Sequence, residues 1–440
     1  MGISNFPASL QPIIQQGFLE REFEQALRSR LGYRMVADRE SFSVGIGETL
    51  TKTRAGLKPS VTTPMAASTN TNLDNGLTPQ GWGVEQYTVT LNFYAATQDL
   101  NMVTSRVGIA SQFLQNASTN GEQAARSLDE LARNALFGPY FGGNTRVLTT
   151  LATPGPTIAV DDIRGFTTVY VNGVQTAVSA ANPLAVMVGS NEYTLVSVTP
   201  DLSNTTTAPT GISGQLTFAT DLAVSDATAG NPVVAGTASI IVRPSGRPTT
   251  AALQAGDSLT MSVLLDAVAT LRQNAVPELD GAYNCYLDPV SARQLFSDPD
   301  FRQLFQGATS SNPVFRQGMV NDFLGLRFIT TNEAYVQTAG VASGLAVRRP
   351  IICGKGALIE ADFAGMGAED VAPKDALVSI IDNVAMVTRE PIDRLQQIIA
   401  QSWYWIGGFC APSDTTTTST TVPTANNSNF KRAVMIEHIG

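Results

Sequence analysis

The apolar and polar positions at the start of the chain predict one helix followed by an extended segment. Residues 12–31 place apolar side chains three and four residues apart, with charged residues on the other side, which is typical of an amphipathic helix. Residues 45–83 carry Gly and Pro at short intervals among Thr, Ser and Asn. Two interpretations of this segment stay open: a disordered linker, or a long two-stranded hairpin that is ordered by a partner, because an isolated hairpin is only marginally stable in water.

A strand and an interrupted helix are predicted next. Apolar and polar residues alternate over 87–93, which is the pattern of a strand with one buried face. Apolar residues then recur at helical spacing over 99–138, with Asp99 as the expected N-cap. Thr119-Asn120-Gly121 is expected to interrupt this helix, and Gly138-Pro139 to end it.

The middle of the chain changes in character and predicts a separate all-β domain. Ionisable residues become sparse between Arg146 and Arg247, and none of them is a lysine. Short β-rich runs separated by Pro and Gly are typical of a small sandwich or barrel. The runs are 157–160, 167–171, 185–188, 193–198, 215–219 and 239–242. Val171-Asn172-Gly173-Val174 predicts a tight hairpin with a two-residue turn. Because helical patterns resume directly afterwards, we interpret this region as an insertion.

The remaining chain predicts a mixture of helices and strands. A helix is expected over 259–271 and a buried strand over 282–287. Asp288 is the expected N-cap of a helix that begins with Pro289, and Asp298-Pro299 begins another. Residues 323–329 predict a turn that leads into a strand, and further strands are predicted at 350–353, 376–387, 394–405 and 433–439.

Composition narrows the possible classes of function. The 440 residues carry a net charge of −9, which excludes a basic nucleic-acid binder. The single histidine, His438, leaves little room for a histidine-based active site, and three widely spaced cysteines exclude a disulfide framework and favour a reducing compartment. We expect neither a secretory signal nor a membrane span. Only 15% of the residues are charged, which predicts that other subunits cover much of the surface.

No group of residues predicts catalysis, a cofactor or a metal site. The segment Gly354-Lys355-Gly356-Ala357 lacks the spacing of a phosphate loop. Trp403-Tyr404-Trp405 is interpreted as sheet core rather than as a sugar or base platform. Three acidic pairs are more typical of caps and loops than of acid–base catalysis or of a hard-cation site. They are Asp298/Asp300, Glu360/Asp362 and Glu369/Asp370.

The role of four arginines near the first predicted helix stays open. Arg28, Arg30, Arg34 and Arg39 either contact nucleic-acid phosphates, or lie on an exposed helix face, or pair with another subunit. Because no catalytic set emerges anywhere in the chain, we expect an architectural protein and not an enzyme.

Several segments of the C-terminal half are similar to coat proteins of tailed bacteriophages. They are Tyr283–Pro289 followed by a helix, Gly325–Asn332, Cys353–Ala357, and Trp403–Trp405 followed after a loop by 433–439. Together with the order of the predicted elements, they resemble the major capsid (coat) proteins of tailed bacteriophages, which have the Hong Kong 97-like fold. The resemblance covers the chain outside the β insertion.

The resemblance implies an α+β, Hong Kong 97-like capsid fold with an inserted all-β domain. We assign 1–44 to an N-terminal arm with a helix, and 45–83 to an extended loop formed by a long β-hairpin. Residues 84–145 are assigned to the strand and long spine helix of a peripheral domain, and 146–250 to the insertion. Residues 251–375 are assigned to an axial domain, and 376–440 to the return to the peripheral and axial sheets and the C-terminal strand.

The resemblance also implies a function. It is that of a major capsid protein which self-assembles into hexamers and pentamers of an icosahedral shell enclosing double-stranded DNA. The expected partners are further copies, portal and scaffolding proteins, a decoration protein, and DNA bound without sequence specificity. The expected location is the virion, after assembly in the host cytoplasm, with no membrane.

Inter-subunit contacts are expected from two segments. In the extended loop they are Lys52, Arg54, Lys58, Leu73 and Trp82, and in the N-terminal arm Phe18, Phe23, Arg28 and Arg30. Some relatives cross-link their shells through a lysine of this loop, which makes Lys52 or Lys58 a cross-linking hypothesis.

Two alternatives to this function stay open. An encapsulin-like compartment shares the fold and would enclose protein cargo without DNA. A monomeric β-rich binding module or glycan-active enzyme belongs to a different class, and would remain a monomer of 46.6 kDa.

Overall fold

The computed structural model describes residues 32–42, 49–55, 84–101, 112–171, 174–201, 213–236, 241–247, 253–302, 322–323, 325–337, 345–363, 377–389, 398–412 and 432–440. They fold into two compact units. The first unit combines Met1–Leu50, Val89–Leu136 and Leu358–Cys410, and the second combines Thr51–Thr88, Phe137–Ala357 and Ala411–Gly440. The helix predicted at 12–31 lies outside the described residues.

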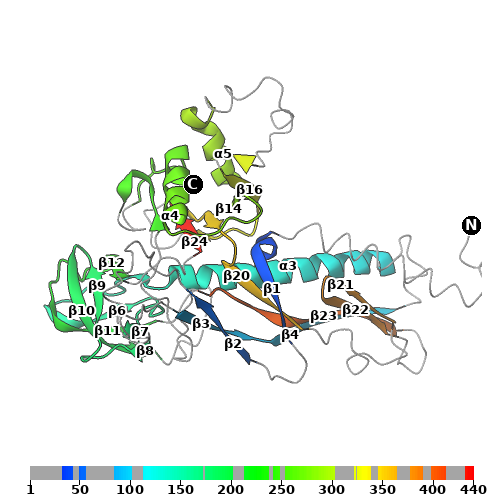
Figure 1. The fold of residues 1–440 in the computed structure, drawn as a ribbon, viewed down its shortest axis with the longest axis horizontal. Coiled ribbons are helices and arrows are strands. Elements are labelled where there is room, and N and C mark those ends of the chain that lie inside the picture. The colour runs from blue at the N-terminus through cyan, green and yellow to red at the C-terminus, as the bar shows by residue number, and fades with distance from the viewer. Residues whose placement is uncertain are drawn as a thin grey trace, which may run out of the picture. The chain divides into compact units, whose positions relative to one another are not determined.

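The first unit is a mixed sheet with a long helix on one face (Figure 1). Its strand order is β1-β20-β23-β22-β21, and β4 also pairs with β23. The strands are β1 (Ala37–Phe42), β4 (Asn92–Asn101), β20 (Leu358–Phe363), β21 (Leu377–Ile381), β22 (Val384–Arg389) and β23 (Ile398–Cys410). β1 runs parallel to β20, whereas β23 is antiparallel to β4, β20 and β22. Strands from the first quarter and the last fifth of the chain therefore meet in one sheet.

Helix α3 (Gln112–Phe141) covers this sheet through an apolar stripe. Ala124, Ala125 and Leu128 are fully buried and share a core cluster with Trp403 and Trp405 of β23. The two tryptophans are 3% and 1% exposed. Alternate residues of a strand point to the same face, so both indoles lie under the helix. The interpretation of this aromatic run as sheet core is confirmed.

The expected start, break and end of α3 are all wrong. Asp99 is not an N-cap, because β4 continues to Asn101 along the long strand β23. The helix is continuous through 119–121, where Asn120 is only 5% exposed. A buried face that extends on both sides of this point overrides the low helix propensity of Asn and Gly. The helix also passes Pro139 and ends at Phe141, before Gly143 with its φ of 78°.

Three expected strands are each divided in two. The strand predicted over 433–439 is divided into β24 (Ala433–Ile436) and β25 (His438–Ile439), which belong to different sheets. The strand predicted over 87–93 ends at Thr90 and resumes at Asn92, because β3 (Val84–Thr90) pairs with β2 (Thr49–Ala55) and β4 pairs with β23. The strand predicted over 376–387 is a hairpin of β21 and β22. Asp382 and Asn383 form its turn, with φ values of 51° and 63°. Asp and Asn are the non-glycine residues that best tolerate this left-handed conformation.

The β2–β3 pair forms a separate two-stranded sheet. These strands lie at the two ends of the segment for which a hairpin and a linker were both considered, and their pairing favours the hairpin at its base. Residues 56–83 lie outside the described residues.

The β-rich middle of the chain is a closed barrel with one apolar core. Its strand order is β5-β12-β9-β10-β11-β6. The strands are β5 (Asn144–Arg146), β6 (Gly155–Val160), β9 (Leu184–Val188), β10 (Asn191–Pro200), β11 (Gly214–Leu222) and β12 (Pro232–Ala235). A bridge between Val147 and Val160, and the 2.8 Å bond from Leu148 N to Ala159 O, join the two outer strands and close the sheet. Closure removes the exposed sheet edges that promote aggregation.

The predicted Asn-Gly hairpin is confirmed. β7 (Thr168–Val171) pairs with β8 (Val174–Ala177), and Val171 lies opposite Val174. Two predicted strands of this region lie outside the barrel. One is β7, which pairs with β8 in a two-stranded sheet of its own, and the other is the run at 239–242. Its described part, β13 (Ile241–Val242), does not join the barrel but runs parallel to β24 in the C-terminal sheet.

The C-terminal half of the second unit is built on a second mixed sheet. Its order is β13-β24-β19-β14-β16-β15. Its other strands are β14 (Tyr283–Leu287), β15 (Asp322–Phe323), β16 (Leu326–Thr330), β19 (Ile351–Cys353) and β24 (Ala433–Ile436). A small three-stranded sheet has the order β17 (Val336–Gln337), β18 (Val347–Arg348), β25 (His438–Ile439). Helix α4 (Met261–Gln273) packs Leu264 and Leu271 into the same core as Cys285 and Ile352.

Helix α5 (Pro289–Ser297) begins as the sequence predicts. The Asp288 side chain accepts hydrogen bonds from the backbone N–H groups of Val290 and Ser291, and Pro289 occupies the first helical position. A further helical turn begins after Asp298, whose carboxylate accepts a 2.8 Å bond from Met261 N and a 3.2 Å bond from Asp300 N. Asp298 therefore has a structural role.

Candidate functional site

The residues predicted to contact other subunits are described only in part. Lys52 and Arg54 both lie on β2, at the base of the hairpin, and are partly buried. Arg54 donates a 2.8 Å hydrogen bond from Nη2 to the carbonyl oxygen of Gly356, and its guanidinium lies 5.9 Å from the centre of the Tyr87 ring. The other predicted contact residues lie outside the described residues. They are Lys58, Leu73, Trp82, Phe18, Phe23, Arg28 and Arg30.

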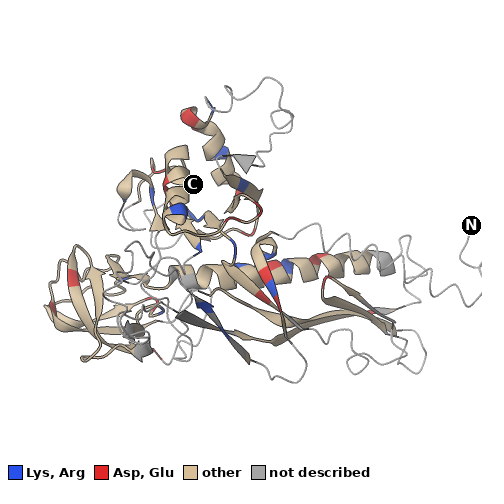
Figure 2. Cartoon of the chain, viewed as in Figure 1, with Lys and Arg blue, Asp and Glu red and all other residues tan. Residues whose placement is uncertain are grey.

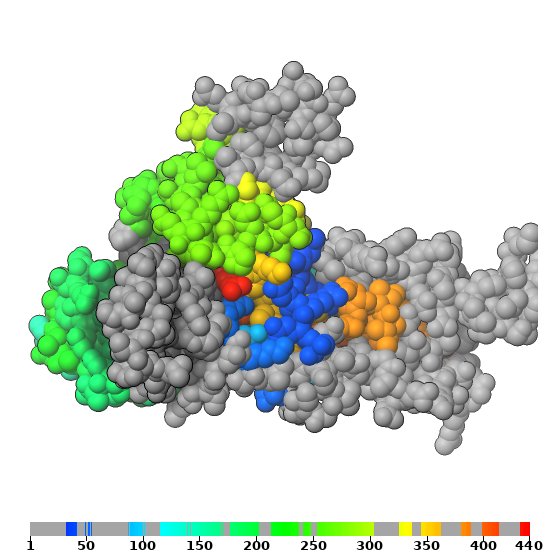
Figure 3. All heavy atoms as spheres, viewed as in Figure 1, coloured from blue at the N-terminus to red at the C-terminus, as the bar shows by residue number. Residues whose placement is uncertain are grey.

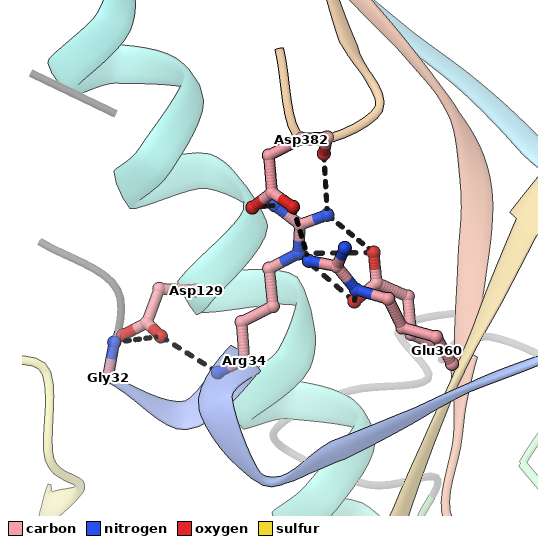
Figure 4. A network of polar contacts seen from close by, with 6 residues as sticks. Gly32, Arg34, Asp129, Glu360 and Asp382 are labelled. Atoms are coloured by element: carbon pink, nitrogen blue, oxygen red, sulfur yellow. Dashed lines mark hydrogen bonds and ion pairs between the residues drawn. The ribbon is translucent and has the colours of Figure 1, made fainter. Parts of the chain in front are cut away.

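A buried polar network holds the first described residues of the chain (Figure 4). Arg34 lies in the short helix η2 (Tyr33–Val36), and its side chain is 1% exposed. Its guanidinium donates to both carboxylate oxygens of Glu360 on β20, with a shortest distance of 2.6 Å. It also donates to the backbone oxygen of Asp382 at 3.1 Å and lies 3.4 Å from the Asp382 carboxylate. One arginine thus joins η2 to β20 and to the β21–β22 turn.

Asp129 of α3 fixes the backbone of the same segment. Its Oδ1 accepts hydrogen bonds from Gly32 N at 2.9 Å and from Arg34 N at 3.2 Å. These are N–H groups at the start of η2, where a helix has no internal acceptors for them. Asp129 is 2% exposed, so this contact is shielded from water. The result is that η2 is tied to the long helix as well as to the sheet.

Arg39 completes the network from β1. Its Nη2 lies 2.6 Å from Asp382 Oδ1, and its Nε lies 3.7 Å from Glu360. The Arg39 side chain is 45% exposed, whereas that of Glu360 is 1% exposed. β1 pairs along its length with β20, and the blue and yellow-orange surfaces of these segments adjoin in the space-filling view (Figure 3).

The proposal that Arg34 contacts nucleic-acid phosphates is wrong. Its donors face carboxylates and a carbonyl of its own chain, and it has almost no exposed surface. The pairing between subunits that was also considered for it is replaced by pairing within the chain. This pairing could not be predicted from the residues around Arg34, because Glu360 lies 326 positions away.

The only histidine lies in a closed polar cluster and not in an active site. His438 Nε2 is 2.8 Å from Ser291 Oγ, and Ser291 Oγ also contacts the Asp288 carboxylate. However, His438 Nδ1 faces the backbone oxygen of Ile439 at 3.1 Å, so no carboxylate orients the imidazole as in a catalytic triad. Ser291 and His438 are fully buried, which excludes a substrate. Burial lowers the pKa of His438 to about 4, so the ring is neutral at pH 7.

The other candidate groups also have structural positions. Cys285 and Cys353 are free and buried, and burial raises the pKa of both thiols. Within the described part of the chain, no three His, Cys, Asp or Glu side chains group as metal ligands. None of the helices described is long and apolar enough to cross a bilayer.

Charged residues are scattered along the described parts of the chain and are mixed in sign (Figure 2). On α3, for example, Glu122, Arg126 and Glu130 are exposed and alternate in sign, and Glu130 pairs with Arg133 at 3.2 Å. Spacings of three and four residues bring such side chains together on a helix. The exposed face of α3 is therefore close to electrically neutral.

The fold is shared with solved capsid structures. A chain in the capsid of Ralstonia phage GP4 superimposes with a TM-score of 0.53 and 10% sequence identity, and the match covers 94% of this chain and 92% of that one. A chain in the capsid of the cyanophage P-SCSP1u matches with a TM-score of 0.47 and 10% identity, over 93% of this chain and 89% of that one. No protein-family model and no curated protein sequence matches the chain.

The likeness to the phage GP4 capsid chain shows the fold of this chain. The chain has the fold of a bacteriophage capsid protein, and the resemblance found in the sequence is confirmed at this level. The match extends over nearly all of both chains, so the likeness is that of a whole protein rather than of one shared domain.

Proposed function

We propose that this chain is the major capsid protein of a tailed bacteriophage with the Hong Kong 97-like fold, and that it self-assembles into the hexamers and pentamers of an icosahedral shell enclosing double-stranded DNA. The observation that carries the proposal is the likeness to the phage GP4 capsid chain over 94% of this chain. In this role the protein is architectural and does not catalyse a reaction.

The residues described above support a role in assembly. The network around Arg34 holds η2 firmly on the first unit, so a segment preceding Gly32 would leave from a fixed point. The β2–β3 pair forms a two-stranded sheet of its own, and such a pair gains stability from packing against a neighbour. We propose that the arm at 1–44 and the extended loop at 45–83 provide the contacts between copies, with the axial domain at 251–375 toward the centre of each capsomer.

Stability of the shell would come from many weak contacts that act together. The partners we propose are further copies of the chain, portal and scaffolding proteins, and a decoration protein that would bind the barrel. The packaged DNA would contact the shell without sequence specificity, in a virion assembled in the host cytoplasm.

Light scattering on the purified full chain tests the proposal. We expect a species far larger than the 46.6 kDa monomer, and hollow particles in electron micrographs. A monomer at every salt concentration would reject the proposal in favour of a monomeric β-rich binding protein or a glycan-active enzyme. Particles isolated from infected cells that contain a protein cargo and no DNA would favour an encapsulin-like compartment.

The charge of the chain predicts how the free subunit behaves toward DNA. Its net charge is −9, and the exposed face of α3 carries both signs. We therefore expect no shift of a double-stranded DNA fragment by the unassembled chain at about 50 mM salt, where electrostatic binding is strong. A clear shift that disappears at about 200 mM salt would show that a basic surface exists and would contradict this part of the proposal.

A further inference from the structure

Arg54 stands at the junction of three elements of the second unit. It lies on β2, its guanidinium lies over Tyr87 of β3, and its Nη2 donates to Gly356 O in the turn between β19 and β20. Tyr87 is 5% exposed, so the contact with the ring is largely shielded from water. A guanidinium about 6 Å or less from a ring centre is attracted to the face of the ring. One side chain therefore connects both strands of the hairpin base to a third segment.

The turn that receives Arg54 is held rigidly. Gly354 N donates to Arg432 O at 2.8 Å, and Lys355 N donates to Pro277 O at 2.9 Å. A Cβ atom at Gly354 would lie 2.4 Å from Val276 Cγ1, so the backbone there is closely packed. Gly356, whose carbonyl oxygen accepts the Arg54 bond, has a φ of 77°. Residues other than glycine adopt this conformation only with strain. The acceptor of the Arg54 bond is thus a fixed point.

A second arginine uses the same turn. Arg432 Nη1 donates to Lys355 O at 3.1 Å, next to the carbonyl that Arg54 uses. Among the described residues no carboxylate pairs with Arg54, and its Nη1 is buried without a hydrogen-bond partner. A cation that is kept partly buried without a counter-ion is costly, and a surface ion pair would be the ordinary alternative. The cost of burying Arg54 without a carboxylate partner is explained if Arg54 holds the base of the hairpin in place.

We propose that Arg54 is a positioning residue which clamps the base of the β2–β3 hairpin to the turn Gly354–Ala357 and thereby sets the direction of the hairpin. A two-stranded sheet has few contacts of its own, so a bond at its base controls its orientation. The consequence of this clamp for assembly rests on the proposed function. If the hairpin points in the same direction in every subunit, all contacts between subunits have the same angle, and all shells have the same diameter.

The first test uses the full chain kept below its assembly concentration. Hydrogen–deuterium exchange is compared for wild type, Arg54→Ala, Arg54→Lys and the control Arg146→Ala, which removes an arginine from a surface ion pair with Asp161. In Arg54→Ala we expect the amides of 49–55 and 84–90 to exchange about tenfold faster or more, the effect of losing a charged hydrogen bond. Arg54→Lys keeps one donor but loses the planar stacking group, so its exchange is expected to be intermediate. Exchange in Arg146→Ala should match wild type in these segments.

The second test measures particle diameters by electron microscopy for the same four proteins. Wild type and Arg146→Ala are expected to give one narrow class of diameters, and Arg54→Ala several classes or open sheets, although its circular dichroism spectrum shows a folded subunit like that of wild type. Unchanged exchange in Arg54→Ala would overturn the clamp. Faster exchange with an unchanged diameter distribution would overturn its role in assembly. If wild type forms no particles, the proposed function fails, and the exchange experiment still decides whether Arg54 is a clamp.

Discussion

The residue with the largest expected effect on the first unit is Arg34. It neutralises Glu360, whose side chain is 1% exposed, and it does so with donors to both carboxylate oxygens. A buried ion pair adds little stability compared with a well-packed apolar pair, because both charges lose their hydration. Removing one partner is different, since an uncompensated charge then stays buried.

We therefore expect Arg34→Met to lower the free energy of unfolding of the unassembled chain by about 3–5 kcal/mol. Urea denaturation measures this value. Arg39→Met is the matched control: its side chain is 45% exposed, and its loss should cost no more than about 1 kcal/mol. The double variant Arg34→Met/Glu360→Met should recover most of the loss. Equal effects of the two single variants would contradict the assignment of the buried pair.

His438 makes the stability depend on pH in a defined direction. Burial lowers its pKa from 6.5 to about 4, while the carbonyl oxygen of Ile439 and the charge of Asp288 oppose this shift and Arg348 reinforces it. Between these two pH values the unfolded chain binds a proton that the folded chain does not bind. The free energy of unfolding therefore falls as the pH drops from 6.5 to about 4, and this contribution levels off below that.

The size of this contribution is about 3 kcal/mol at most. We expect His438→Gln to lose less stability than wild type between pH 6.5 and 4.5, as measured by urea denaturation at each pH. Carboxylates titrate in the same range in both proteins, so the difference between the two profiles isolates His438. Parallel profiles would show that this histidine does not titrate as described.

At the scale of elements, local signals in the sequence predicted those structures that local chemistry decides. Asp288 caps α5 as expected, and the Asn-Gly pair joins β7 to β8. The alternation around Trp403 and Trp405 correctly indicated a strand with one face in the core. In each case a few neighbouring residues are sufficient to determine the local structure.

The elements that were predicted wrongly depend on distant partners. α3 continues through 119–121 because its buried face packs on strands 250 or more positions later, where Asn116 Nδ2 bonds Gln401 Oε1 at 2.7 Å. β4 extends to Asn101 because β23 continues beside it. The Arg34 network joins residues from four segments, and nothing near Arg34 in the sequence indicates them. Pairing over such separations cannot be predicted from periodicity.

The turn between β21 and β22 allows a test at this scale. Asn383 has a φ of 63°, where a β-branched residue is strained by about 1–2 kcal/mol. We expect Asn383→Val to lower the melting temperature of the chain and Asn383→Gly to leave it equal or slightly higher. Thermal unfolding followed by circular dichroism measures both. A valine variant that melts like wild type would show that the turn has another conformation.

For the whole molecule, the proposed function rests on a fold that is shared over nearly the full length with a phage capsid chain at only 10% identity. Such low identity means that the shared feature is the arrangement of helices and strands, and not particular surface residues. The predicted contact residues Lys52, Lys58, Phe18 and Phe23 consequently remain predictions, and their test requires an assembled particle.

Electron cryomicroscopy of the full chain, expressed alone or with a scaffolding protein, tests whether copies of this chain build a closed shell. We expect closed icosahedral particles in which rings of six and five subunits share the fold described above, with the segment at 56–83 in contact with a neighbouring subunit. Dispersed single chains of 46.6 kDa under all conditions, or particles in which that segment touches only its own chain, would contradict it.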